Sequence, residues 1–174
     1  MTRGSAWLAV VLLVLLGGCR TAVDHPPAQT SQPPPPPAAA LVERVRAAAS
    51  ADDALEVSPL RDGATEDLSA RASRLEGLGD IAGAEQALHE ALQLAPGDPL
   101  LLQQAAELAL LRHDWNQAIA LAGRSFESGP RLGPLCRRNW TTVQVAREQF
   151  GDRGGSAAAE QQLGQCTIAP PVRM

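Results

Sequence analysis

Several residue types are scarce or missing in this chain of 174 residues. It has no tyrosine, three tryptophans and two phenylalanines. A hydrophobic core must therefore be built from leucine, alanine and valine, which suits helices that pack closely on small side chains. Lysine is also missing, so all 15 basic side chains are arginine, and the formal net charge is −4. This mild acidity excludes the strongly basic surface expected of a nucleic-acid partner. The length allows one modest domain with extensions.

The apolar run near the N-terminus is short. It extends from Ala6 to Leu16, and its eleven residues are too few for a helix to cross the ~30 Å hydrocarbon core of a bilayer. Arg3 precedes the run, and two glycines follow it. A positive start, a short apolar run and small residues at its end predict a signal peptide over residues 1–18.

The end of this segment, Leu16-Gly17-Gly18-Cys19, resembles the lipobox of bacterial lipoproteins. In that family the cysteine thiol receives a diacylglycerol and the preceding peptide is removed. The resemblance implies that Cys19 is lipidated and anchors the chain in a membrane, with two or three acyl chains giving stable attachment. Arg20, in place of the aspartate of many inner-membrane lipoproteins, favours the outer membrane with the domain in the periplasm. The alternatives are the periplasmic face of the inner membrane and an ordinary secretory signal that ends near a cysteine.

Residues 19–40 are predicted to be a lipid-anchored, proline-rich linker. The five prolines from Pro33 to Pro37 lack a backbone N–H and have a fixed φ, so they favour extended polyproline II. We expect a stalk that lifts the domain off the membrane, with a proline-rich ligand for another domain as the alternative. Residues 41–58 have helical spacing of apolar residues. We expect this N-terminal helix either to cap the open end of the following domain or to be only partly ordered.

The domain predicted at residues 63–166 repeats with a period of 34 residues. A fixed period of this size is typical of stacked helical hairpins. Each hairpin ends at a proline, and an aspartate marks the turn between its two helices. The repeated positions are Asp80 and Asp114, Ala84 and Ala118, and Pro96 and Pro130.

This pattern resembles the tetratricopeptide repeat family. The family has a large and then a small apolar residue in the first helix, and alanine, a bulky residue and alanine in the second. The matching residues are Leu68, Ala72, Ala84, Leu88 and Ala91 in the first repeat, and Leu102, Ala106, Ala118, Ala122 and Ser125 in the second. The resemblance implies an all-α array of two clear repeats and a degenerate third, with Thr65 capping its first helix. The alternative is two unrelated hairpins that share a spacing.

The third hairpin departs from the family pattern. Gly151-Asp152 mirrors Gly79-Asp80 but comes four residues late, so we expect its first helix to be one turn longer. Trp140 stands where the family has a small residue. We expect residues 156–165 to form a degenerate capping helix with a polar outer face, followed by a tail at 167–174.

Two cysteines fall on this hairpin at matched levels. Cys136 lies about fifteen residues before the turn and Cys166 about fourteen after it, and antiparallel helices with equal rise bring such residues side by side. Because the periplasm is oxidising and Cys19 is used by lipid, the remaining pair predicts a disulfide. A loop of this size contributes roughly 3–4 kcal/mol. The alternatives are two buried free thiols or an incomplete metal site.

No catalytic constellation is present in the sequence. His89 and His113 have no cysteine or second histidine at metal-ligand spacing. No glycine-rich phosphate loop follows a predicted strand. We therefore expect no enzyme activity, no metal and no cofactor.

In the tetratricopeptide repeat family, the first helices line a concave groove that takes extended or helical peptides. The resemblance implies a groove that is acidic at one end, rich in amides in the middle and basic at the other. We expect a lipid-anchored adaptor or scaffold for a protein or peptide partner in a secretion, pilus or cell-wall complex. A structural spacer or capping subunit without a groove ligand is the alternative, and the oligomeric state stays open. The expected groove residues are Glu66, Ser69, Ser73, Glu76, Gln103, Gln104, Glu107, Arg137, Thr141 and Gln144.

Overall fold

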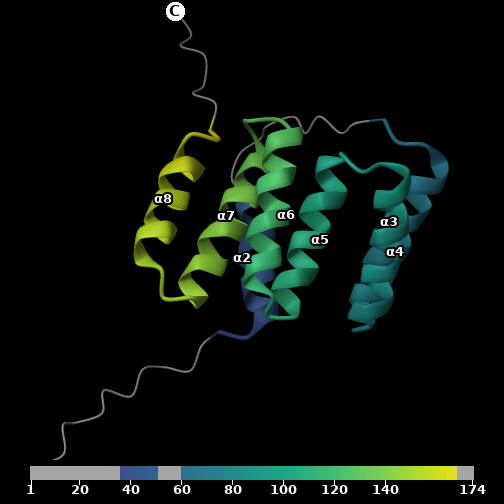
Figure 1. Cartoon of the computed structure of the whole chain (residues 1–174), viewed down its shortest axis with the longest axis horizontal. Coiled ribbons are helices and arrows are strands. Elements are labelled where there is room, and N and C mark those ends of the chain that lie inside the picture. Colours follow the sequence, from purple (N-terminus) through teal and green to yellow (C-terminus); the bar gives the residue numbers. More distant parts are fainter. Residues whose placement is uncertain (1–35, 51–59, 168–174) are drawn as a thin grey trace, which may run out of the picture. The chain divides into compact units, whose positions relative to one another are not determined.

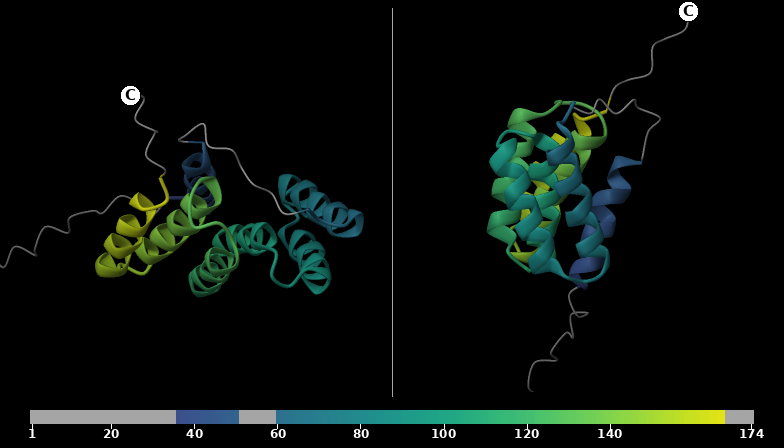
Figure 2. Two further views of the ribbon diagram at one scale, coloured as in Figure 1. Left: turned by 90° about the horizontal axis from the view of Figure 1, so that it is seen from above. Right: turned by 90° about the vertical axis from the view of Figure 1, so that its right-hand side faces the viewer.

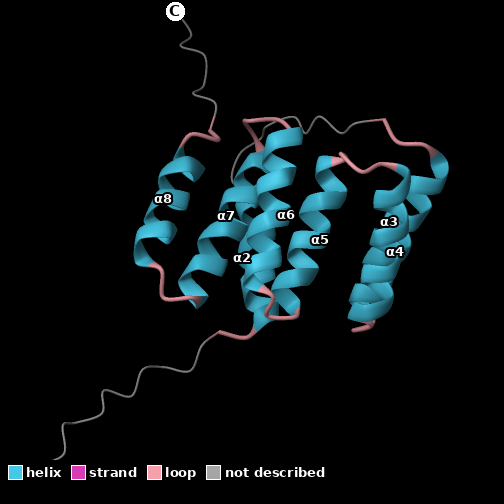
Figure 3. Ribbon diagram, viewed as in Figure 1, coloured by secondary structure: helices cyan, strands magenta, loops and turns pink. Residues whose placement is uncertain are grey.

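The structure is a computed structural model that describes residues 36–50 and 60–167. These residues form seven helices and no strand (Figures 1 and 3), so the predicted all-α class is confirmed. The signal peptide, Cys19 and most of the proline-rich linker lie outside the described residues, as do residues 51–59 and the end of the C-terminal tail. The helices are α2 (Ala38–Ala49), α3 (Gly63–Gly77), α4 (Ile81–Leu94), α5 (Pro99–Leu111), α6 (Trp115–Ser128), α7 (Pro134–Gln149) and α8 (Arg153–Gly164).

Helices α3 to α8 form three consecutive hairpins. The paired helices are α3 with α4, α5 with α6, and α7 with α8, and neighbouring hairpins join through α4 against α5 and α6 against α7. Figure 1 shows this side-by-side order. The predicted array of helical hairpins, similar to tetratricopeptide repeats, is therefore confirmed.

One turn geometry recurs in all three hairpins. In the first, the Gly79 N–H donates to the Glu76 carbonyl and the Asp80 N–H donates to the Leu75 carbonyl, the pattern of a Schellman motif. Gly79 has φ 80°, in the left-handed region where glycine is favoured. The residue after it caps the next helix, so the last turn of one helix and the start of the next share a two-residue junction.

Aspartate caps five of the described helices. Asp80, Asp114 and Asp152 each accept a hydrogen bond from the backbone N–H three residues later, and Asp62 and Asp98 cap α3 and α5. An N-cap carboxylate satisfies backbone donors that have no partner within the helix.

The prediction that Thr65 caps the first helix is corrected. The α3 helix begins at Gly63, and the cap is Asp62, which accepts from the Thr65 N–H at 2.9 Å and from its hydroxyl at 2.7 Å. Thr65 is fully buried. Its hydroxyl completes the cap from the first turn of the helix, so the sequence placed the start of the helix three residues late.

The core is made of small and aliphatic side chains, as the composition predicts. Alanines of α3 and α4 pack with Leu88, and Leu101 and Leu108 of α5 close the same cluster. Alanine at the helix contacts lets neighbouring backbones approach closely. Trp140, which stands where the family has a small residue, lies edge-on to the Phe126 ring with centroids 5.0 Å apart.

The third hairpin carries the predicted disulfide. Cys136 of α7 and Cys166, just after α8, are bonded, with Cα atoms 5.6 Å apart. The Gly133 N–H also donates to the Cys166 carbonyl at 2.8 Å. The α7 helix has 16 residues, against 15 in α3 and 13 in α5, so the expected extra turn is approached relative to α5 but is not present relative to α3.

The N-terminal helix is present, but its position differs from the expected one. We expected it either to cap the open end of the array or to be only partly ordered. Instead α2 packs against α5 and α7, and Figure 2 shows it alongside α7. None of the described helices is long and apolar enough to cross a membrane.

Candidate partner-binding groove

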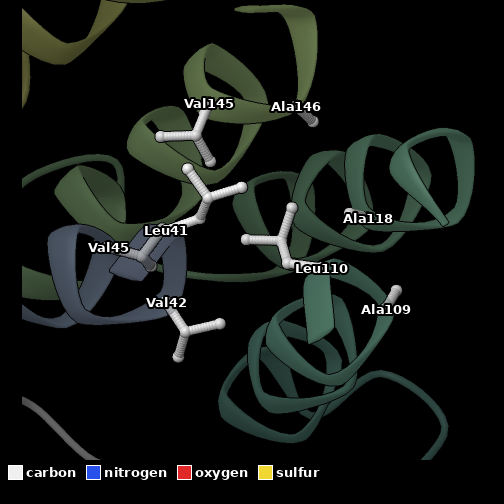
Figure 4. Packing of buried hydrophobic residues seen from close by; sticks show 8 residues of the cluster. All are labelled: Leu41, Val42, Val45, Ala109, Leu110, Ala118, Val145 and Ala146. Carbon is white, nitrogen blue, oxygen red and sulfur yellow. The ribbon is translucent and has the colours of Figure 1, made fainter. Parts of the chain in front are cut away.

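The helix α2 occupies the surface on which we expected a partner. The first helices of the hairpins, α3, α5 and α7, present a common surface, which we call the first-helix face. Leu41, Val42 and Val45 of α2 are at most 3% exposed. They pack in one cluster with Leu110 of α5 and Val145 of α7 (Figure 4). The apolar stripe of α2 is therefore part of the core and is not an exposed cap.

Two polar contacts fix the direction of α2 on α7. At its middle, Arg44 binds Glu148, close to the end of α7, through two bonds of 2.7 and 3.0 Å. At its end, the Arg137 side chain from the first turn of α7 donates to the carbonyls of Ala48 and Ala49 at 2.8 and 3.0 Å. The two helices therefore run antiparallel. Arg137 also satisfies terminal carbonyls of α2 that have no partner within that helix.

Glu107 of α5 is the centre of this contact. Its side chain is 1% exposed, and a buried carboxylate is tolerated only when it is well paired. Arg46 of α2 donates to it at 2.8 Å, Arg138 of α7 at 3.0 Å and the Gln103 amide at 3.0 Å. Arg46 also reaches Glu76 of α3 at 2.7 Å. One carboxylate thus joins α2, α5 and α7, and Arg46 extends the network to α3.

Beside α2, a cavity of about 400 Å³ remains open on the first-helix face. Its wall is polar. The Ser69 hydroxyl donates to Gln104 at 3.1 Å, and the Gln104 amide donates to Ser73 at 2.9 Å. The cavity is lined by Arg46, Arg61, Ser69, Ser73, Glu76, Gly77, Leu100, Gln104, Glu107 and Arg138.

The structure divides the expected groove residues into two groups. Five of them line the open cavity: Ser69, Ser73, Glu76, Gln104 and Glu107. The others do not line it. Glu66 is exposed and pairs with Arg61 at 3.2 Å, Gln144 is partly buried on α7, and Gln103, Arg137 and Thr141 are buried.

In this structure Arg137 is therefore covered by α2 and not open to a partner, and its role in a groove stays a prediction. Its side chain is 5% exposed and is used by the end of α2. Helical spacing placed Arg137 on the right face of α7, but it gave no sign that another segment of the chain covers that face. The basic end of the predicted gradient is consequently occupied.

Sequence reasoning missed two of the cavity arginines. Arg46 belongs to α2, whose docking position was not predicted, and Arg61 precedes the first helix of the array. The neighbouring Asp62 could have indicated the position of Arg61. An N-cap at Asp62 brings the residue before it close to the domain.

Arg61 and Asp98 form a two-bond ion pair at the edge of the cavity. Two bonds of 2.6 and 2.9 Å join them, and the same carboxylate caps α5 by accepting from the N–H groups of Leu100 and Leu101. Burial of Asp98 acts to raise its pKa, but the bonds from Arg61 and from these N–H groups prevail, so the pKa lies below its usual value. Arg61 is thus fixed in place as one of the residues that line the cavity.

A second cavity, of about 220 Å³, lies between α4, α5 and α6. Apolar side chains such as Leu88 and Leu121 line it, together with His89 and the ion pair of Arg112 with Glu85. Within residues 36–50 and 60–167 there is no group of three or more histidine, cysteine or acidic side chains able to hold a metal ion.

The fold and the face together define the class: a helical-hairpin repeat domain, similar to tetratricopeptide repeats, whose first-helix face holds a helix. No family model and no curated protein sequence matches the chain. Among solved structures, the globular C-terminal domain of P. aeruginosa LpoP is similar, with 30% sequence identity and a TM-score of 0.57. The match covers 60% of this chain and 99% of that one. The chain belongs to the family of this LpoP domain.

Proposed function

We propose that this chain is a lipid-anchored adaptor of the bacterial envelope that binds a protein partner through its first-helix face. It faces the periplasm, and the outer membrane is the membrane we propose. The likeness to the LpoP domain favours a partner in cell-wall assembly, with a peptidoglycan synthase as the class, over a secretion or pilus complex.

The observation that carries this proposal is the way the face binds α2. It takes up three apolar side chains, pairs Arg46 with a buried carboxylate and donates from Arg137 to the end of the helix. These contacts combine apolar burial with matched charges on one helix, and this complementarity supports a role of the face in binding a partner. The cavity beside α2 leaves room for more side chains of a partner.

The competing proposal is a spacer that has no groove ligand. A spacer needs only stable packing between its hairpins, and it needs no open polar cavity on the first-helix face. The linked side chains of Ser69, Gln104 and Ser73 contribute to such a cavity and favour the adaptor.

Site-specific photocrosslinking in intact cells tests the proposal. A photoreactive phenylalanine analogue at Ser73, which lines the cavity, should give an adduct with a cell-wall protein. The same analogue at Ala82, exposed on α4, is the matched control and should give none. No adduct at Ser73, or the same adducts at both positions, would contradict an adaptor that uses this face.

Charge reversal at Glu107 or Arg137 is a poor test of the same point. Glu107 is buried among two arginines and an amide, and Arg137 binds the end of α2. Reversal would leave an unpaired buried charge, which is strongly destabilising. Loss of partner binding in such variants would not separate recognition from folding.

A further inference from the structure

We infer that the surface covered by α2 is a docking site for a helix of the protein partner, which displaces α2 and binds in its place. This inference rests on the proposed function and names the segment that the partner uses. The docking surface consists of Gln103, Glu107 and Leu110 of α5, and Arg137, Thr141, Val145 and Glu148 of α7.

The contacts of α2 specify the chemistry of the partner helix. Leu41, Val42 and Val45 supply its apolar stripe, Arg44 meets Glu148, and Arg46 meets Glu107. We therefore expect an antiparallel helix with an apolar pair followed by arginines three and five residues after the first apolar residue. It ends about one turn later, so that Arg137 can donate to its last carbonyls, as it does to those of α2.

Release of α2 does not strand the buried carboxylate at the centre of the site. When Arg46 leaves, Glu107 retains the guanidinium of Arg138 and the amide of Gln103. A buried carboxylate without a partner is costly, so this second pair of donors makes exchange of the helix feasible. A partner arginine restores the third contact.

The helix α2 also depends on its docking surface for its own stability. It has 12 residues, three of them buried, and a helix of this length is marginal without its docking surface. Thr141 lies one turn from both Arg137 and Val145, and its buried hydroxyl has no hydrogen-bond partner in the described part of the chain. Opening of α2 hydrates this group, and local opening of such elements occurs without global unfolding.

A peptide-binding experiment with the full-length protein tests the inference. The variant Leu41→Asp/Val45→Asp places charge in the apolar stripe and should free α2. The probe is a fluorescent peptide with the native sequence of residues 36–50. The peptide should bind this variant. Its binding to the wild type should be weaker by about tenfold or more, because α2 competes there at a high effective concentration. Glu43→Gln/Ala47→Gln, on the exposed side of α2, is the matched control and should behave as the wild type.

Two results would overturn the inference: a folded Asp variant that does not bind the peptide, or equal binding by wild type and variant. A dimer in light scattering that dissociates in the Asp variant would also overturn it, because the docked helix would then be α2 of a second copy.

Hydrogen exchange of the wild type provides a test that needs no variant. Amides of Val45 to Ala49 should exchange faster than those of Leu108 to Leu111 in α5, and equal protection contradicts the inference.

The outcomes also separate this inference from the proposed function. If the partner displaces α2, the Asp variant should increase the yield of Ser73 adducts. If Ser73 adducts form but their yield does not change when α2 is freed, displacement is excluded while the adaptor role stands. If no adduct forms at Ser73 even when α2 is freed, the proposed function itself fails.

Discussion

The turn of each hairpin contains one residue with a positive φ. The conformational free energy that this residue costs differs between the repeats. Gly79 and Gly151 have φ of 80° and 70°, while His113 occupies the matching position with φ 61°. A residue with a Cβ pays roughly 1–2 kcal/mol to adopt this conformation. The His113 ring lies edge-on to Trp115 with centroids 5.1 Å apart, a contact that offsets part of this cost in the second repeat.

The positive φ at Gly79 predicts how a substitution there changes the stability of the domain. Gly79→Ala should reduce the free energy of unfolding by about 1 kcal/mol, because alanine resists a positive φ, although a Cβ there meets nothing within 4 Å. The matched control is Gly77→Ala, in the last turn of α3, where a Cβ also meets nothing within 4 Å and alanine is the better helix former by about 0.5–1 kcal/mol. Urea denaturation measures both changes, and equal effects would contradict the explanation.

The helix α8 depends on its covalent link more than any other element of the array. It packs against α7, at the end of the array, and Ala159 is its one buried residue. So small a contact area gives little hydrophobic stabilisation. The bond from Cys136 to Cys166 and the hydrogen bond from Gly133 therefore hold the end of α8 in place.

Removal of the disulfide should release α8 before the rest of the domain. The double variant Cys136→Ala/Cys166→Ala should lose roughly 3–4 kcal/mol of stability, because the unfolded chain gains the freedom of a loop of about thirty residues. Hydrogen exchange should show lost protection in α8 and retained protection in α4. Thiol labelling of denatured, unreduced protein from the periplasm supplies the complementary check. Two reactive thiols there, or a variant as stable as the wild type, would refute this account.

Over the whole molecule, the predicted tether and α2, the helix that covers the proposed docking surface, are neighbours in sequence. The helix α2 begins at Ala38, one residue after the proline run ends, and it is the first described element after the predicted linker. Displacement of α2 would add its 12 residues to the chain between the membrane anchor and the array. Partner binding would then also change how far the array can extend from the membrane.

At the scale of the whole molecule, we predict that a lipid anchors the chain to the membrane. Cys19 should carry lipid and be the first residue of the mature chain, because only its thiol supplies the thioether that the lipobox resemblance implies. Cys19→Ser should remain an uncleaved precursor. Mass spectrometry of protein purified from membranes, with the serine variant as control, measures both outcomes. An unmodified Cys19 or a different mature N-terminus would remove the basis for membrane attachment.

The sequence by itself determined the features that depend on local pattern. The 34-residue period predicts the hairpins, the aspartates mark helix starts, and the levels of Cys136 and Cys166 predict the disulfide. Helical periodicity and caps act over one or two turns, so they can be read along the chain. The error at Thr65 is a shift of a few residues within the same local pattern.

Only the tertiary structure decided where α2 lies. Its periodicity shows which of its sides is apolar, but an apolar stripe fits any complementary surface of the array. The choice depends on contacts between residues far apart in the sequence, such as Arg46 with Glu107, 61 residues away, and Arg137 with Ala48, 89 residues away. Such pairings depend on the assembled shape and charge of the first-helix face, and no local pattern encodes them.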